Sequence, residues 1–417
     1  MIKRPLLLTL LLLTACQQLS GPPTPDFDVQ APTPIRVWPG ADSTVTLRLA
    51  RTGGHAAPVT LTVQSPLPGL SASVTSAGEQ VEVRLQARGD LPLQGYVPVA
   101  LTISDGTLTR NVRLPVEVGD VIDREQRRLN DLRRSAHLPG VPFDVPGSMN
   151  CWLHGRYAVH NNARGHTEDL SLPHATPEGR TCAEQSNVMR YAPTLDELRR
   201  NTDVVDSLIG APFHAMGMLD RDLRSSVVGL YVHTTPLPGG YFPAGGAVTV
   251  SDRPGNSAQT VQYPGDGAVT DLLSYGGGEW PNPLTPCAGF IGTTGLPLFV
   301  MTTPGTETTA TLPSVQVGGK TVPACAYGST QYVNTTDPPG NYTGGPVSAQ
   351  EMGRRILKGQ GAVIVIPRTP LPAGATVQVA VTVNGQLHAW SFTTAQQGSL
   401  RPQHLHRERK LDGAEQE

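Results

Sequence analysis

The chain has 417 residues, with 32 basic and 34 acidic side chains, 45 glycines and 39 prolines. This much glycine and proline excludes a helical bundle, a coiled coil and a polytopic membrane protein, and the near balance of charge leaves no basic face for nucleic acid. At roughly 100–200 residues per domain, the length allows two to four domains.

The first residues predict export. A positive start precedes a short apolar run over residues 6–13, which is too short to span a bilayer but fits a cleaved signal. The following Leu13–Cys16 (LTAC) resembles the bacterial lipoprotein box, and the resemblance implies acylation of Cys16. The alternative is an ordinary signal peptide cut just before Cys16. We assign residues 1–25 as signal peptide and tether, with a lipid on Cys16 anchoring the mature chain to a membrane.

Residues 26–119 predict an all-β module. Apolar and polar residues alternate in five stretches, whose apolar members begin at residues 45, 59, 81, 97 and 112. Period two with β-branched residues indicates half-buried strands, and turn dipeptides such as Asp105-Gly106 separate them. Short strands at this spacing indicate an immunoglobulin-like β-sandwich. Because the segment shows no titratable cluster, we interpret it as a spacer or adhesive module.

Residues 120–237 mix helices and strands. Apolar residues at helical spacing follow Asp120, and a second helical stretch covers about 148–162. A third helix opens at Thr194 with Glu197 three residues on, which is a capping box, and an apolar stripe then continues to residue 209. The segment after Val227 has the composition of a strand.

Residues 238–396 return to strands and predict a small all-β domain. A buried run covers 362–367, and alternating arms on either side of Asn384-Gly385 predict a hairpin. The glycine run 276–278 leads to Glu279 with no helix after it, which argues against phosphate binding, so we expect that loop simply to lie in this domain. Residues 397–417 are charged with few apolar side chains and predict a disordered tail.

Four cysteines remain besides Cys16: Cys151, Cys182, Cys287 and Cys325. An even number in an exported protein favours disulfides over free thiols, and four cysteines allow three connectivities. Proximity in the sequence favours Cys151–Cys182 and Cys287–Cys325. The chain has no C-x-x-C motif, which argues against a redox centre or a four-cysteine zinc site.

An ordered set of short motifs between residues 120 and 235 resembles the CAP superfamily, which includes cysteine-rich secretory proteins, antigen 5 and pathogenesis-related proteins of class 1. The set includes Leu129-Asn130, Gly165–Glu168 (GHTE), Cys182–Gln185 (CAEQ), Ala211–His214 (APFH) and Val228–Leu230 (VGL). The resemblance covers under a third of the chain. It implies a central α-β-α sandwich with a cleft, between the two β domains.

In that family two histidines and two acidic residues line the cleft. Residue by residue, His166 and His214 match the histidines, and Glu184 matches one acid loosely because its neighbours differ from the usual Gly-Glu-Asn. The second acid, expected just before the APFH motif, is missing. Glu168 is an alternative acid. We expect the other two histidines of this region, His154 and His160, at the surface or the edge of the core.

Two neutral imidazoles with a carboxylate can bind a divalent transition metal. His166 and His214 are therefore a candidate weak, exchangeable zinc site, with no metal or other cofactor required for folding. Such binding should weaken as the pH falls through about 6.5, the reference imidazole pKa. The competing interpretation is that His166, Glu184 and His214 form a hydrogen-bonded cluster that only fixes the packing of the helices.

Together these features favour a secreted, envelope-tethered CAP-domain lipoprotein. We expect it to bind an unidentified small molecule, lipid or envelope partner through the His/Glu-lined cleft, and not to be an enzyme. One alternative is a metal-dependent hydrolase of peptides or cell-wall polymers, which the missing second acid disfavours because hydrolysis needs a positioned base besides the metal ligands. The other is a purely adhesive or structural envelope protein.

Overall fold

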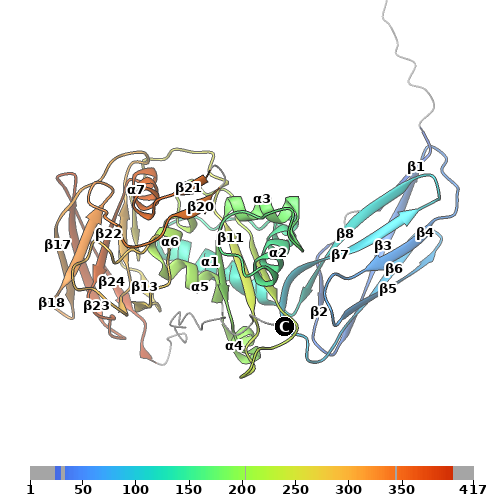
Figure 1. Cartoon of the computed structure of the whole chain (residues 1–417), viewed down its shortest axis with the longest axis horizontal. Coiled ribbons are helices and arrows are strands. Elements are labelled where there is room, and N and C mark those ends of the chain that lie inside the picture. The colour runs from blue at the N-terminus through green and yellow to red at the C-terminus, as the bar shows by residue number, and fades with distance from the viewer. Residues whose placement is uncertain (1–23, 30–32, 202, 343–344, 398–417) are drawn as a thin grey trace, which may run out of the picture.

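The structure is a computed structural model that describes residues 24–29, 33–201, 203–342 and 345–397 (Figure 1). The predicted signal peptide, its lipidation site Cys16 and nearly all of the predicted tail lie outside these residues. The chain is mostly β-structure and forms three parts in a row, with a β-sandwich at one end, a helical part in the middle and further β-sheets at the other end (Figure 1).

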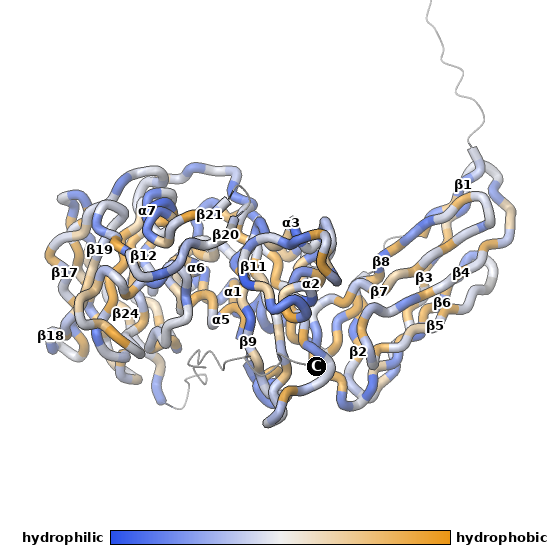
Figure 2. Tube along the Cα trace, viewed as in Figure 1, coloured by the Kyte–Doolittle hydropathy of each residue, from blue (hydrophilic) through white to orange (hydrophobic). Residues whose placement is uncertain are grey.

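The N-terminal part is an immunoglobulin-like sandwich, as predicted. Its sheets have the orders β1-β3-β6-β5 and β2-β8-β7-β4, which correspond to the ABED and CFG sheets of that fold. The strands are β1 (Asp26–Val29), β2 (Ile35–Val37), β3 (Asp42–Thr52), β4 (Thr60–Gln64), β5 (Leu70–Ala77), β6 (Gln80–Ala87), β7 (Gln94–Ser104) and β8 (Thr109–Val118). Hydrophobic residues alternate along these strands (Figure 2). Three strands were not predicted, because β1 and β2 are short and β5 is rich in serine.

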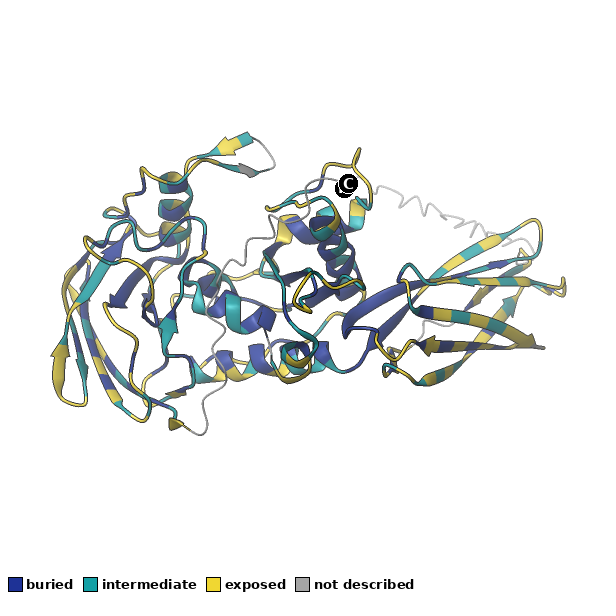
Figure 3. Cartoon of the chain, turned by 60° about the horizontal axis from the view of Figure 1, so that its bottom comes forward, coloured by how far each residue is buried: buried dark blue, intermediate teal, exposed yellow. Residues whose placement is uncertain are grey.

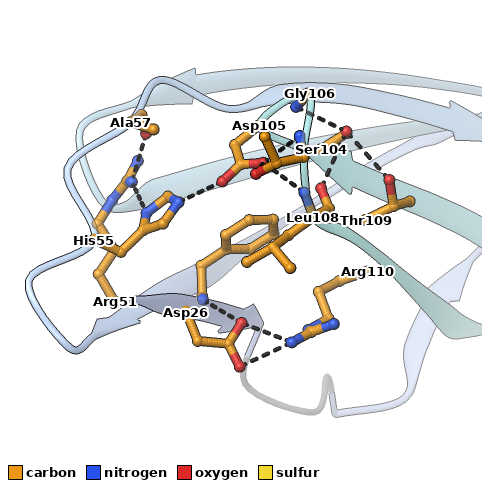
Figure 4. A network of polar contacts seen from close by, with 12 residues as sticks. Asp26, Arg51, His55, Ala57, Ser104, Asp105, Gly106, Leu108, Thr109 and Arg110 are labelled. Atoms are coloured by element: carbon orange, nitrogen blue, oxygen red, sulfur yellow. Dashed lines mark hydrogen bonds and ion pairs between the residues drawn. The ribbon is translucent and has the colours of Figure 1, made fainter. Parts of the chain in front are cut away.

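The expectation that this module lacks a titratable cluster is wrong. Arg51 Nη1 lies 2.7 Å from His55 Nδ1, and His55 Nε2 lies 2.7 Å from a carboxylate oxygen of Asp105, with both partners of the second pair buried (Figure 4). Backbone amides, first that of Leu108, and the His55 side chain hold the pKa of Asp105 below its usual range. Since Arg51 can only donate, His55 donates from Nε2. The network ties the loop after β3 to the β7–β8 turn.

The middle part has a three-stranded antiparallel sheet in the order β10-β11-β9. Its elements are α1 (Val121–Ser135), α2 (Val145–His160), α3 (Pro177–Gln185), β9 (Ser186–Tyr191), α4 (Leu195–Arg200), α5 (Asp203–Gly210), α6 (Pro212–Met218), β10 (Val228–Val232) and β11 (Ala244–Thr249). Because β11 is the central strand, the predicted boundary at residue 237 falls too early. The predicted capping box of Thr194 and Glu197 is confirmed, but its helix ends at Arg200 and α5 follows as a separate helix.

Helix α2 lies against this sheet at three glycines. A Cβ atom on Gly229 would lie 2.3 Å from the Cβ of Cys151, and one on Gly155 would lie 2.5 Å from the carbonyl oxygen of Gly245. Real Cβ atoms do not approach other atoms so closely. The glycines therefore set the distance between the helix and strands β10 and β11. Both predicted disulfides are confirmed, and Cys151–Cys182 joins α2 to α3 on the same side of the sheet.

The C-terminal part has two larger sheets, in the orders β12-β16-β22-β19 and β13-β24-β23-β17-β18. Its elements are β12 (Val261–Tyr263), β13 (Val269–Thr270), β14 (Ser274–Tyr275), β15 (Thr294–Gly295), β16 (Leu298–Met301), β17 (Ala310–Val317), β18 (Lys320–Val322), β19 (Ala324–Gly328), β20 (Gly340–Tyr342), β21 (Gly345–Val347), α7 (Ala349–Gln360), β22 (Ala362–Pro367), β23 (Thr376–Val383) and β24 (Gln386–Thr394). The predicted hairpin at Asn384-Gly385 joins β23 to β24. Helix α7 was missed, although Ser348 caps its start and Gly361, with φ of 58°, ends it.

The three parts share their hydrophobic cores. One cluster runs from α1 and β10 into the buried strands β16 and β22, and a second joins the sandwich to Trp152, Leu153 and Tyr231. Figure 3 shows that all three parts contain buried segments. At the second junction the buried Gln94 accepts hydrogen bonds from Trp152 Nε1 at 3.2 Å and Val232 N at 3.0 Å. The middle part therefore packs on both neighbours. No helix in the described ranges is long and apolar enough to cross a membrane.

A buried carboxylate on α1 predicts a stability that falls at alkaline pH. Glu125 accepts the amides of Val204 at 3.1 Å and Val205 at 2.9 Å, and burial raises its pKa to about 8. The folded chain then binds a proton that the unfolded chain releases near pH 4.5, so this contribution is full below pH 4.5 and is lost as the pH rises through about 8.

We therefore expect the free energy of unfolding to fall by roughly 1–2 kcal/mol between pH 7 and pH 9. Urea titrations at the two pH values measure this, and Glu125→Gln should remove most of the difference. An equally large fall in the variant would show that another group is responsible. Burial also raises the pKa of Asp203 to about 7, so this residue adds a smaller fall of the same sign, which should persist in the Glu125→Gln variant.

Candidate functional site

His166 lies between α2 and α3 and is oriented by a backbone carbonyl. Its Nδ1 is 2.8 Å from the oxygen of Ser186, and because a carbonyl only accepts, Nδ1 carries the proton. Burial, and then the charges of the nearby His214 and His154, lower the pKa of His166 to about 4. At pH 7 the ring is therefore neutral, with its lone pair on Nε2.

His214 lies in the first turn of α6 and is oriented by a carboxylate. Its Nδ1 is 2.7 Å from Oε1 of Glu279, and its backbone amide donates to the same oxygen at 2.9 Å. The residue before α6, Ala211, provides no side-chain cap, so Glu279 takes that place. Burial raises the pKa of Glu279. Its other oxygen, Oε2, is buried without a hydrogen-bond partner among the described residues.

The two histidines share one arrangement. Each has Nδ1 engaged by an oxygen of the protein and Nε2 left as the second ring nitrogen, which is the usual way in which a protein orients an imidazole for a ligand. Their proximity shows in the effect of His214 on the pKa of His166. Among the described residues, however, no three His, Cys, Asp or Glu side chains are already arranged to hold a metal.

The acid that the structure places here differs from the one expected. Glu184 forms an ion pair with Arg180 at 2.9 Å, and its side chain is 36% exposed. The carboxylate on His214 is Glu279, from the loop to which the sequence interpretation gave no role. Sequence reasoning missed it because it lies 65 positions from His214 and outside the resembling segment. The single acidic residue between a glycine run and Trp-Pro was the only signal.

His154 and Glu168 form a separate buried pair. His154 Nδ1 is 3.0 Å from Glu168, and Glu168 also accepts the amide of Thr176, the N-cap of α3, at 2.8 Å. His154 is 3% exposed, so its expected place at the surface or core edge is wrong. Glu168, the alternative acid, contacts His154, and its bonds hold the start of α3 against α2.

Two aromatic residues of the C-terminal part adjoin this region. Tyr342, at the end of β20, stacks on His166 with ring centroids 5.3 Å apart, and Trp280 lies 5.8 Å from Tyr342. Trp280 donates to the carbonyl of Pro338 at 2.9 Å, which fixes its ring. The β20–β21 ribbon accordingly lies between the C-terminal sheets and the middle part (Figure 1). The site thus combines residues of two parts of the chain.

No protein-family model and no curated protein matches the chain. Among solved structures, domains 4 and 5 of the S-layer protein SbsC are 20% identical over 23% of this chain and 54% of that one, with a TM-score of 0.17. The Yersinia pseudotuberculosis adhesin InvE is 10% identical over 89% of this chain and 58% of that one, with a TM-score of 0.15. An I-band fragment of titin is 9% identical over 89% and 98%, with a TM-score of 0.17. At these scores the likenesses carry no argument about this chain.

Proposed function

We propose that the chain is an exported, envelope-associated protein of the CAP type that binds a ligand or partner at the His166–His214 site without catalysing a reaction. The observation that carries the proposal is the matched orientation of the two imidazoles, each held at Nδ1. The ordered motifs of residues 120–235 support the family assignment. The two disulfides indicate that the chain folds outside the reducing cytoplasm.

A non-catalytic role follows from what the site carboxylate does. Hydrolysis at a metal requires a positioned base besides the metal ligands. Glu279 is committed to the ring and the amide of His214, so it orients a ligand-binding nitrogen and caps α6. A hydrolase acting on peptides or wall polymers therefore remains the weaker reading of this site.

Zinc is the probe for this site. In isothermal titrations of the whole mature chain, we expect His166→Ala and His214→Ala each to weaken the same binding event at least tenfold, and Glu279→Gln to weaken it about 10–100-fold through the orientation of His214. The exposed His137, whose Nε2 contacts the carbonyl of Asp266 at 2.8 Å, gives the control His137→Ala. Unchanged zinc affinity in either site variant would refute a shared site.

The pH dependence expected from a reference imidazole needs revision for this site. Because burial lowers the pKa of His166 to about 4, protons compete for this nitrogen only as the pH falls toward that value. The zinc affinity contributed by His166 should therefore persist below pH 6.5. The same titrations repeated at pH 5.5 measure this.

The lipid anchor at Cys16 is part of the proposal. Its basis is the LTAC sequence alone. Replacing Cys16 with serine should move the protein from the membrane fraction to the soluble fraction, since an acyl chain is what would hold it there. Equal distribution of the two proteins, with no acyl mass on the wild type, would refute the anchor.

A structural role is the second candidate, and the stacking of Tyr342 on His166 favours it. In that case the histidines hold the C-terminal part on the middle part, and the chain serves as a rigid envelope or adhesive element. His166→Ala would then lower the free energy of unfolding by about 1–3 kcal/mol, because buried hydrogen-bonding groups would lose a partner. Zinc would then bind at this site in neither the wild type nor the His166→Ala variant.

A further inference from the structure

Three other histidines gather outside the His166–His214 site. His160 ends α2, His174 lies in the loop before α3, and His233 follows β10. The ring of His160 lies 4.2 Å from that of His174 and 5.2 Å from that of His233, measured between centroids. His160 is exposed and the other two are partly exposed. The end of α2, the loop after it and the end of β10 thus bring three imidazoles to one place on the surface.

In both His160 and His233, one ring nitrogen contacts a neighbouring residue and the other ring nitrogen is left as a candidate ligand. His160 Nε2 lies 3.0 Å from the hydroxyl of Tyr231, which is itself buried. His233 Nδ1 lies 3.1 Å from both the amide and the carbonyl of Thr235. Contacts of this kind orient metal-binding histidines, and the ligand nitrogen is then the one that they leave.

The loop that carries His174 is held in an unusual conformation. His174 has φ of 64°, a left-handed region that side chains other than glycine seldom adopt. The side-chain amide of Asn161, next to His160, donates to the carbonyl of Pro173 at 2.8 Å. This hydrogen bond joins the residue after His160 to the residue before His174, and so holds the loop against the end of α2.

The surroundings of His160 and His174 lower the pKa values of both rings. Partial desolvation of its ring lowers the pKa of His160, and the charges of His174, His233 and Arg156 act in the same direction. The pKa of His174 is also lowered, first by burial and then by Arg156. Metals bind the neutral form of imidazole, and the lowered pKa values of His160 and His174 favour that form.

We propose that His160, His174 and His233 form a second site, for a zinc-class transition metal, which is independent of the proposed function. A zinc–nitrogen distance of 2.0–2.1 Å places the ring centroids of two ligands about 5 Å apart, close to the separations observed. The described residues do not already converge on an ion, so binding requires the three rings to turn toward the ion from the positions that their present contacts give them. Three nitrogens leave a fourth position open for water or for a donor group of a partner.

The test uses the whole mature chain carrying His166→Ala and His214→Ala, which removes the other candidate site. We expect this protein to bind one equivalent of zinc in calorimetric titration. Adding His174→Ala or His233→Ala should weaken that binding at least tenfold, whereas adding the control His137→Ala should leave it unchanged. Circular dichroism of each variant checks that it is folded.

Cobalt provides a second readout that does not depend on heat. Bound at three imidazoles, Co²⁺ should show the visible absorption of a tetrahedral site, and this should disappear with His174→Ala. No zinc binding in the double variant, or binding that survives loss of His174 and of His233, would overturn the proposal. Because the host already lacks His166 and His214, failure here is distinct from failure at that site.

Discussion

Replacing Gly229 with alanine should lower the free energy of unfolding by about 3 kcal/mol or more, because overpacking against a rigid element is among the most costly substitutions. The new Cβ would lie 2.3 Å from the Cβ of Cys151, 2.7 Å from its carbonyl carbon and 2.9 Å from the amide nitrogen of Trp152. These atoms belong to or adjoin the backbone of α2. They also lie beside a disulfide, so the helix must shift as a whole.

Urea unfolding followed by tryptophan fluorescence measures the loss. Gly359→Ala is the matched control, because this glycine lies within α7 and a Cβ there meets nothing within 4 Å. A helical glycine of this kind should tolerate alanine or gain up to about 1 kcal/mol. Equal stability of the Gly229→Ala variant and the wild type would show that α2 does not sit on β10 as described.

Loss of the Cys151–Cys182 disulfide should have the second large effect. The bond closes 31 positions of chain between α2 and α3, and removal of such a bond from an exported domain costs about 2–5 kcal/mol. The closed segment contains His166, so Cys151→Ala with Cys182→Ala should also loosen the contact of that ring with Ser186. We expect zinc binding at this site to weaken together with stability.

The matched comparison is the Cys287–Cys325 bond, which closes 38 positions. Its removal should destabilise the chain by a similar amount, because the loops are of similar length. It should not act on zinc binding through the His166 loop, which lies outside that closed segment. If the free energy of unfolding of the Cys151→Ala, Cys182→Ala variant lay within about 0.5 kcal/mol of the wild-type value, the bond would not be a stabilising crosslink.

Local patterns in the sequence predicted the sandwich well and the links between the parts poorly. Strands such as β6 bury every second residue, and alternation of that kind can be read directly. The addition of β11 to the middle sheet could not be predicted, because its AGGAVT sequence has two glycines at the points where α2 and α5 approach. Glycines that permit close packing resemble loop residues until their neighbours are known.

The residues of the candidate site differ in the same way, between those that a local motif indicates and those that only tertiary packing brings together. His166 and His214 could be proposed from the sequence because a motif accompanied each of them. Glu279 could not, because its partner is distant in sequence and its role at the start of α6 depends on tertiary packing. Likewise, nothing local relates His160, His174 and His233, since only the end of α2, one loop and the end of β10 bring them together.

The central claim is that the imidazoles of His166 and His214 are both held at Nδ1 by an oxygen of the protein, with Nε2 left to bind. Nitrogen-15 NMR of the whole mature chain at pH 7, with His166→Ala and His214→Ala to assign the signals, tests it most directly. We predict that both rings carry their proton on Nδ1 and that His166 stays neutral as the pH falls toward its pKa of about 4. Protons on Nε2, or titration of His166 near pH 6.5, would contradict the account.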